Sequence, residues 1–365
     1  MFRSPTNSAT AFLLAALIAT QTLSATALNS KIDYHDSGAQ SITKAALTEK
    51  AKYEKIKIAA YKEIRRVTAQ GDSKNLKLKY DVSASFPKDL RDFYLTQVKR
   101  TSKLIAVFLT KEEVINVYLS TEKDAKEIEQ HPIHGRYYQD FVRWFKEWRG
   151  GVGREHNLGL AGNYFYTDGK WEGHVGTLVY SGAKRNSLRR YSTQVVPHEY
   201  FHVVQDYFLN VGREFNWPDS DTYDRYSPPT FREGSANTIS FVLASKNERE
   251  YLDFYRYFIA EKKQQREVKI FSELKTEADV VRILKQMENR NARPDVMEAS
   301  YAMGQLLYEW LIANYGFEPY KQIVESQLRY ENFGENVKAN LGFSTNELYR
   351  RAAPHILAAF RLGAT

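Results

Sequence analysis

The chain of 365 residues contains no cysteine. It can therefore form no disulfide bond, it has no thiolate nucleophile, and no cysteine sulfur can bind a metal. Histidine and carboxylate side chains are the strong metal ligands that remain. Since the sequence has only 8 histidines, a pair of them at a regular spacing is informative.

Long apolar stretches are also missing, apart from one near the start of the chain. The run Ala11–Ala19 follows Arg3 and precedes the small-x-small pattern Ala25–Ala27. These features are typical of a secretory signal peptide, and the run is too short to span a bilayer comfortably. We therefore expect residues 1–27 to be a signal peptide, and the mature protein to be secreted or periplasmic in a bacterium, with no stable membrane insertion. An uncleaved membrane anchor is the alternative.

Acidic residues are outnumbered by basic ones, which gives a formal net charge of +8 and a sequence pI near 9.2. This balance favours acidic partners or an anionic cell surface but says nothing about the fold. Because no nucleic-acid-binding motif accompanies the charge, we expect no nucleic-acid partner.

The hydrophobic pattern is mixed at first and helical afterwards. Before about residue 185 it predicts helices at 41–70, 87–110 and 137–148 and strands at 76–85, 114–120, 163–167 and 174–180. After that it predicts helices at 186–209, 231–245, 247–265, 272–290, 298–314, 316–329 and 345–361, with a proline-containing loop at 217–229. We therefore expect an α+β fold with a small mixed upstream lobe and an all-helical downstream lobe. The expected segments after the signal peptide are residues 28–110, 111–190 and 191–365.

One motif carries chemistry. His198 and His202 are four residues apart with Glu199 between them, so both imidazoles lie on one helix face and can reach one zinc ion. Such a pattern arises by accident in roughly one chain of this kind in a hundred, and the alternative is two ordinary core histidines. Pro197 directly precedes the motif, so we expect the helix to begin at or near Pro197 or to be kinked there.

A catalytic zinc needs a third protein ligand. The segment Phe231–Asn237 contains Glu233, which follows His202 by 31 residues. This separation leaves room for the end of one helix, a loop and a second helix that returns to the metal. Gly234 and Ala236 are small and suit a close approach of another helix behind the ligand.

Together these motifs resemble the gluzincin branch of the zincin metallopeptidases, in which a His-Glu-x-x-His helix is followed by a helix with a Glu-Gly-x-Ala motif. Thermolysin, the aminopeptidases and the bacterial collagenases are of this type, and Ser300–Gly304 is similar to a later helical segment in such proteins. The resemblance implies one Zn²⁺ per chain held by His198, His202 and Glu233 in a cleft between the lobes. It implies a peptide or protein substrate, with Glu199 as the general base.

A hydrogen-bond donor usually helps the metal to stabilise the oxyanion in this group. Tyr301 is the candidate, with His355 and Tyr226 as rivals and a buried packing role as the alternative for Tyr301. Asn237 and Asp206 each lie four residues after a predicted ligand, and either could orient a ligand histidine.

Gluzincins often bind the substrate backbone along an edge strand upstream of the ligand helix, and the alternating run His174–Tyr180 is the candidate. A structural strand is the equal alternative. Two other functions stay open. One is a zinc hydrolase with a different substrate, such as a cell-wall peptide. The other is an inactive peptidase-like module that binds cell-wall or surface glycan or peptide.

Overall fold

The computed structural model describes residues 44–124, 157–165, 170–179, 185–209, 220–264 and 268–362, except residues 290, 292 and 294. The expected signal peptide and the predicted helix at 137–148 lie outside the described residues.

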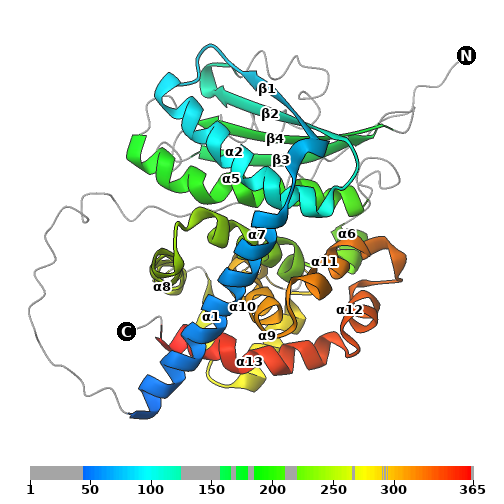
Figure 1. Cartoon of the computed structure of the whole chain (residues 1–365). Helices are drawn as coiled ribbons and strands as arrows, with labels where there is room; N and C mark the ends of the chain where they lie inside the picture. Colours follow the sequence, from blue (N-terminus) through cyan, green and yellow to red (C-terminus); the bar gives the residue numbers. More distant parts are fainter. Residues whose placement is uncertain are drawn as a thin grey trace, which may run out of the picture.

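The described chain begins with a mixed α/β part and continues almost entirely as helices (Figure 1). The first part contains α1 (Lys44–Gln70), β1 (Leu76–Val82), α2 (Lys88–Phe108), β2 (Glu113–Thr121), β3 (Asn157–Phe165) and β4 (Trp171–Val179). The second part contains α5 (Arg185–Phe208), α6 (Ser220–Tyr226), α7 (Pro229–Ala244), α8 (Glu248–Gln264), α9 (Glu277–Gln286), α10 (Val296–Tyr315), α11 (Phe317–Glu325), α12 (Phe333–Leu341) and α13 (Thr345–Leu362). Short 3₁₀ turns lie at Ser73–Asn75, Glu122–Asp124, Lys269–Glu273 and Gln327–Arg329. An α+β architecture with a small upstream sheet and a mostly helical downstream part is therefore confirmed.

The sheet has the strand order β1-β2-β4-β3. The strands β1, β2 and β4 are parallel, and β3 pairs antiparallel with β4. The helices α2 and α5 pack against each other beneath the sheet, and α5 also contacts β3 and β4 (Figure 1). The predicted edge strand at 174–180 is therefore wrong as an edge, because β4 lies between β2 and β3. Among the described strands, β3 is the edge on that side.

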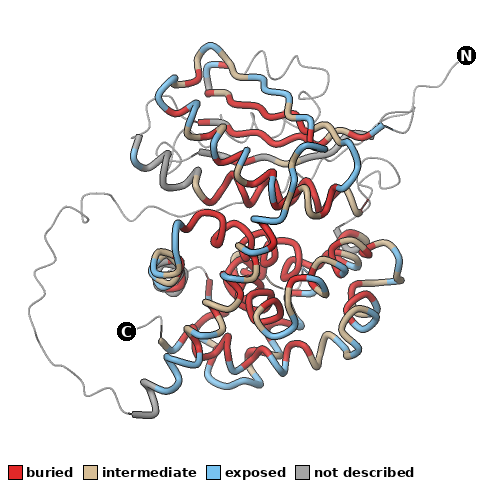
Figure 2. Tube along the Cα trace, viewed as in Figure 1, coloured by how far each residue is buried: buried red, intermediate tan, exposed pale blue. Residues whose placement is uncertain are grey.

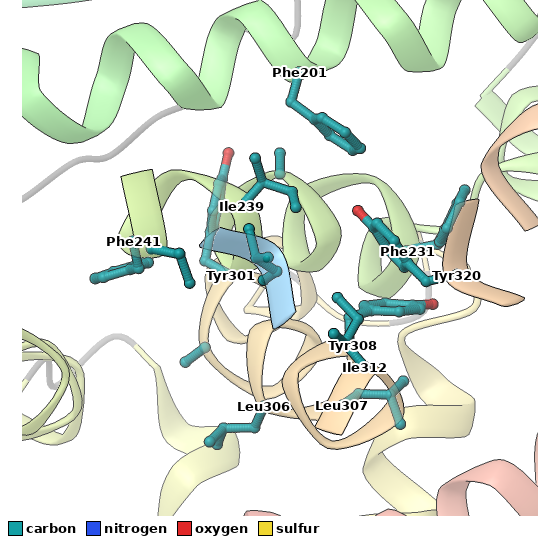
Figure 3. Close-up of a cluster of buried hydrophobic side chains, with 14 of the residues drawn as sticks. Phe201, Phe231, Ile239, Phe241, Tyr301, Leu306, Leu307, Tyr308, Ile312 and Tyr320 are labelled. Carbon is teal, nitrogen blue, oxygen red and sulfur yellow. The ribbon is translucent and has the colours of Figure 1, made fainter. Parts of the chain in front are cut away.

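The helical part is built around α10, which is buried along most of its length (Figure 2). Apolar residues occupy nearly its whole circumference, as expected of a helix enclosed on all sides. It packs most extensively on α7 and also on α1 and α13. Figure 3 shows Phe231, Tyr308 and Tyr320 meeting where α7, α10 and α11 come together, with Phe231 and Tyr308 ring centroids 5.4 Å apart.

Two glycines let α7 and α10 touch through their backbones. A Cβ atom on Gly234 would lie 2.3 Å from the carbonyl carbon of Gly304, and one on Gly304 would lie 2.4 Å from the carbonyl oxygen of Thr230. Such separations are far inside van der Waals contact, so only glycine fits. The close approach expected at Gly234 is confirmed, and it fixes the position of the neighbouring Glu233.

The long helix α1 runs alongside both parts of the molecule (Figure 1). It packs on α2 next to the sheet and on α10, α13, α7 and α8 in the helical part. Tyr53, Ala60 and Ile64 are buried in the same hydrophobic core as α10. The segment that precedes the sheet is thus integrated into the helical core.

Two local predictions need correction. The helix with the histidine pair begins at Arg185, close to the start of the helix predicted at 186–209, so it does not begin at Pro197, which lies in its interior. The predicted loop at 217–229 contains the short helix α6, and α7 begins at Pro229 with proline in its first turn. None of the described helices combines the length and apolar character needed to cross a membrane.

Candidate metal centre

Two helices supply the predicted ligands. His198 and His202 lie one turn apart on α5, and their rings meet edge to face with centroids 4.7 Å apart. Glu233 lies near the beginning of α7, which packs across α5. The structure therefore brings the three side chains together as one buried cluster that could hold a metal ion.

The ligand atoms form a nearly equilateral triangle. The two Nε2 atoms of His198 and His202 are 3.0 Å apart, and Oε2 of Glu233 is 3.4 Å from each of them. Bonds of about 2.0–2.1 Å at tetrahedral angles place ligand atoms about 3.3–3.4 Å apart. The centre of the observed triangle is about 1.9 Å from each atom, so an ion slightly above its plane satisfies all three bonds.

Burial favours a cation in this arrangement. The three side chains are buried, and among the described residues no hydrogen bond reaches either carboxylate oxygen of Glu233 or of Glu199. A buried carboxylate without a donor is costly. A metal ion would satisfy Glu233, and a water held beside that ion would satisfy Glu199. The residues therefore fit a metal.

Proton affinities in the cluster reflect the same crowding. Burial lowers the pKa of His198, whereas for His202 the negative charge of Glu233 outweighs burial and raises the pKa. Burial raises the pKa of Glu199 to about 8, with a further contribution from the charge of Glu233. Burial alone would raise the pKa of Glu233, but the adjacent histidines hold it well below its usual range. A cation between these groups would favour the deprotonated form of each.

Gln205 orients His202. Sequence reasoning did not identify Gln205 in this role. Its Oε1 is 2.7 Å from Nδ1 of His202, while its Nε2 donates to the carbonyl oxygen of Arg232 at 3.1 Å and to Oγ of Ser235 at 2.8 Å. Since the amide nitrogen is engaged by acceptors, Oε1 accepts the Nδ1 proton and leaves the Nε2 lone pair free for a metal. The signal was available, because Gln205 lies three residues after His202 on the same helix face.

Of the two residues expected in this orienting role, Asp206 does not perform it, whereas Asn237 lies beside the other ligand histidine, His198. Asp206 accepts a hydrogen bond from the Tyr223 hydroxyl at 3.3 Å and makes none to His202. Burial outweighs a side-chain interaction with Asn237 that would raise the pKa of His198. The Oδ1 atom of Asn237 accepts a hydrogen bond from Gln194, and its Nδ2 atom donates to the carbonyl oxygen of Tyr301. The Nδ1 atom of His198 is buried, and no described residue forms a hydrogen bond of good geometry with it.

Glu199 points from α5 at the edge strand. A Cβ atom on Gly159 of β3 would lie 2.2 Å from Cγ of Glu199 and 2.6 Å from Val195. Only a glycine at this strand position leaves room for the glutamate. The side chain expected to act as base therefore lies between the ligand helix and β3, the edge strand of the described sheet.

Tyr301 lies beside the cluster, and Figure 3 shows its side chain rising from α10 toward α5. Its ring centroid is 5.8 Å from that of His198. Burial raises the pKa of Tyr301 well above its ordinary value, and the charges of Glu233 and Glu199 act in the same direction. The rival His355 instead contacts Glu309 at 2.8 Å, in a separate buried group. The rival Tyr226 packs against Leu209 and Tyr223.

Arg232 is a second residue that sequence reasoning missed. It directly precedes Glu233 on α7, is buried, and places its guanidinium carbon 4.6 Å from the centre of the Tyr223 ring. Its Nε atom is 3.9 Å from Oε1 of Glu233. Nearby Tyr223, Asp206 and Glu233 raise its pKa despite burial, so it carries a permanent positive charge next to the ligands.

Comparisons with protein-family models, with curated proteins and with solved structures find no match to this chain. The geometry of the buried cluster is therefore the basis for assigning a function.

Proposed function

We propose that this protein is an exported zinc-dependent peptidase of the gluzincin type. The observation that carries the proposal is the buried triangle of His198, His202 and Glu233, with Glu199 on the same helix as the two histidines. Two imidazoles and one carboxylate form a ligand set typical of catalytic zinc, which keeps a further position for water or substrate.

Local charge supports a divalent ion. Glu199, Glu233 and Asp206 are buried within one region, and Arg232 is the positive charge among them. When the three carboxylates are ionised, two negative charges remain uncompensated. A buried imbalance of this size is costly, and a divalent cation removes it.

Glu199 is suited to moving a proton. When bound, zinc would supply an activated water and polarise the peptide carbonyl. Neither carboxylate oxygen of Glu199 has a donor among the described residues, so both are available to accept the proton of that water. Burial raises the pKa of Glu199 to about 8 in the metal-free chain, which makes the carboxylate a stronger base. The same group then delivers the proton to the leaving amine.

Tyr301 is the proposed donor to the oxyanion. Because burial raises its pKa well above the ordinary value, the phenol remains protonated at working pH and retains a hydrogen to donate. Its position beside His198 supports this role, because the carbonyl oxygen of the substrate would become negative near the metal ligands.

The strand β3 is the proposed guide for the substrate backbone, in place of the strand expected from the sequence. Within the described sheet its only neighbour is β4, and Gly159 places its backbone against Glu199. A peptide that adds to the outer edge of β3 through main-chain hydrogen bonds would run past the base. This role requires no particular side chain in the substrate.

Two variants test the proposal against a matched surface variant. Glu199→Gln should retain one zinc per chain by elemental analysis and lose at least about 100-fold in turnover on a mixed peptide library. Glu233→Ala should lose most of the metal. Glu277→Gln, an exposed glutamate of α9, should resemble the unsubstituted protein. Cleavage by that protein should stop on chelation.

Full turnover by Glu199→Gln would disprove the assignment of the base. Unchanged zinc content in Glu233→Ala would place the third ligand elsewhere. A protein that holds zinc but cleaves no member of the library would favour the binding-module alternative.

A further inference from the structure

In the described part of the chain, the guanidinium of Arg232 has donors without acceptors. Its Nε and Nη1 atoms are buried and make no hydrogen bond there. Among the described residues its one ion-pair contact is with Oε1 of Glu233, and at 3.9 Å this is too long for a hydrogen bond. Tyr223 stabilises the charge through its ring face but does not satisfy the N–H groups. The side chain is 4% exposed.

Unsatisfied donors of a buried arginine need an explanation, because buried guanidinium groups are normally paired. The metal cannot provide it. A cation would satisfy the orphaned carboxylate of Glu233, but it repels the guanidinium and offers no lone pair. The donors of Arg232 therefore require an acceptor that is separate from the protein ligands and from the ion.

The position of Arg232 identifies where that acceptor comes from. One oxygen of Glu233 faces the histidines and the other faces Nε of Arg232. The guanidinium is thus separated from the metal triangle by the width of one carboxylate, at most about 8 Å from an ion bound there. In a peptide, the carboxylate that ends the residue after the cleaved bond lies only three bonds from the reacting carbonyl carbon.

We propose that Arg232 binds a carboxylate of the substrate in the residue that follows the cleaved bond. This inference rests on the proposed peptidase function. Arginine suits the task, since its planar donors match a carboxylate and keep their charge at every working pH. The carboxylate has two possible sources: the C-terminus of the substrate, which would make the enzyme a carboxypeptidase, or an aspartate or glutamate side chain at that residue.

Binding to an inactive form separates these sources. Zinc-loaded Glu199→Gln is titrated calorimetrically with acetyl-dialanine, with its C-terminal amide, and with acetyl-alanyl-aspartyl amide. A site for a terminal carboxylate binds the first probe about 10- to 100-fold more tightly than the second. A site for an acidic side chain gives that advantage to the third probe. Equal affinities for all three probes overturn the proposal. This test keeps Arg232 in place, so it does not depend on the folding of an Arg232 variant.

Substitution then assigns the preference to one residue. In the Glu199→Gln background, Arg232→Met should reduce the affinity ratio between the preferred probe and the uncharged amide to about one. Arg232→Lys should leave an intermediate ratio, because lysine keeps the positive charge but lacks the planar pair of donors. Arg225→Met, the same substitution at an exposed arginine of α6, should leave the ratio unchanged. An undiminished ratio in folded Arg232→Met refutes the assignment.

The activity of the unsubstituted protein distinguishes the two levels of the argument. Chelator-sensitive cleavage with equal kcat/KM for peptides with a free C-terminus, with an amidated C-terminus and with an aspartate after the cleaved bond refutes the role of Arg232 but not the peptidase function. A chain that binds no zinc and cleaves no peptide removes the proposed function itself.

Discussion

Replacing Lys57 by methionine should cost the folded protein about 3–5 kcal/mol. Lys57 lies on α1 and is 1% exposed, and its Nζ atom is 2.6 Å from Oε2 of Glu309 on α10. Glu309 also accepts hydrogen bonds from the Tyr251 hydroxyl and from Nε2 of His355. Removing the lysine leaves a buried carboxylate that has lost its permanent positive partner.

Burial disfavours the charged form of both Lys57 and Glu309, but the partner outweighs burial only for Glu309. Burial alone would raise the pKa of Glu309, but Lys57 and His355 outweigh it and lower the pKa from 4.5 to about 2. This shift corresponds to about 3 kcal/mol in favour of the carboxylate. For Lys57, burial outweighs the attraction of Glu309 and lowers the pKa from 10.5 to about 8, a cost of similar size. The pair as a whole therefore contributes little, while either charge alone is costly.

Urea unfolding at pH 7 measures this coupling. Lys57→Met and Glu309→Gln should each lower the free energy of unfolding by about 3 kcal/mol or more, and the double variant should lose much less than their sum. Lys62→Met, whose ion pair with Glu248 is exposed, should change it by at most about 1 kcal/mol. The reasoning would be refuted if the two single-variant losses added up to the loss of the double variant within about 0.5 kcal/mol.

The same group gives a pH dependence with a defined sign. The folded pKa of Glu309 is below its unfolded value, so its stabilisation is present above pH 4.5 and is lost as the pH falls toward about 2. Burial lowers the pKa of His355, so the unfolded chain takes up that proton first and stability also falls below about pH 6.5. As the pH falls, the midpoint temperature of thermal unfolding should decrease through both of these pH ranges. Glu309→Gln should lack the decrease in the lower range.

Three further outcomes concern the metal centre. Gln205→Ala should weaken zinc binding about 10- to 100-fold in competition with a chelator, because His202 loses the acceptor that fixes its tautomer. Gly159→Ala should keep the zinc but reduce turnover, since the added methyl group would collide with Glu199; equal turnover would mean that the strand is not held against the base. Acidification through the range of the two imidazoles should release zinc, with about a tenfold loss of apparent affinity per pH unit for each protonated ligand, measured by equilibrium dialysis at a series of pH values.

The convergence of the three ligands could be predicted because it depends on local geometry and on ligand chemistry. The four-residue spacing of His198 and His202 fixes a shared helix face, and the need for a third ligand singles out Glu233 as the carboxylate of a second motif. Tyr301 could be placed nearby only through the resemblance. Its position depends on the glycine contact between α7 and α10, of which the sequence shows the small residues but not their pairing.

Strand order could not be predicted, since alternation shows that a segment is a strand and does not identify its neighbours. The run at 174–180 has the same pattern whether it lies at an edge or inside the sheet. The antiparallel return through Asn157–Phe165 determines the outcome, and much of that strand was not predicted because it contains Gly159 and Gly162, which weaken the strand signal.

The expectation of a helix start or a kink at Pro197 had a physical reason. Proline in a helix interior removes one hydrogen bond and costs about 3 kcal/mol or more, although the hydrophobic pattern by itself predicted a helix over 186–209. In the structure Val195, Val196, Tyr200 and Phe201 are buried around it. Full burial of such side chains contributes roughly 1.5–3 kcal/mol each, which outweighs one missing hydrogen bond. Tertiary packing, which the local sequence does not show, keeps α5 continuous.

The Lys57 pair also bears on whether the segment before the sheet is removable. Glu309 follows Tyr301 by eight residues on α10, about 12 Å along one helix. The helix that presents Tyr301 to the metal cluster therefore depends on α1 to neutralise a buried charge farther along it. Cleavage within α1 would expose that charge and the core face of Tyr53, Ala60 and Ile64. A chain that starts just before residue 44 should hold zinc and unfold like the longer one, whereas a chain that starts after residue 70 should not fold.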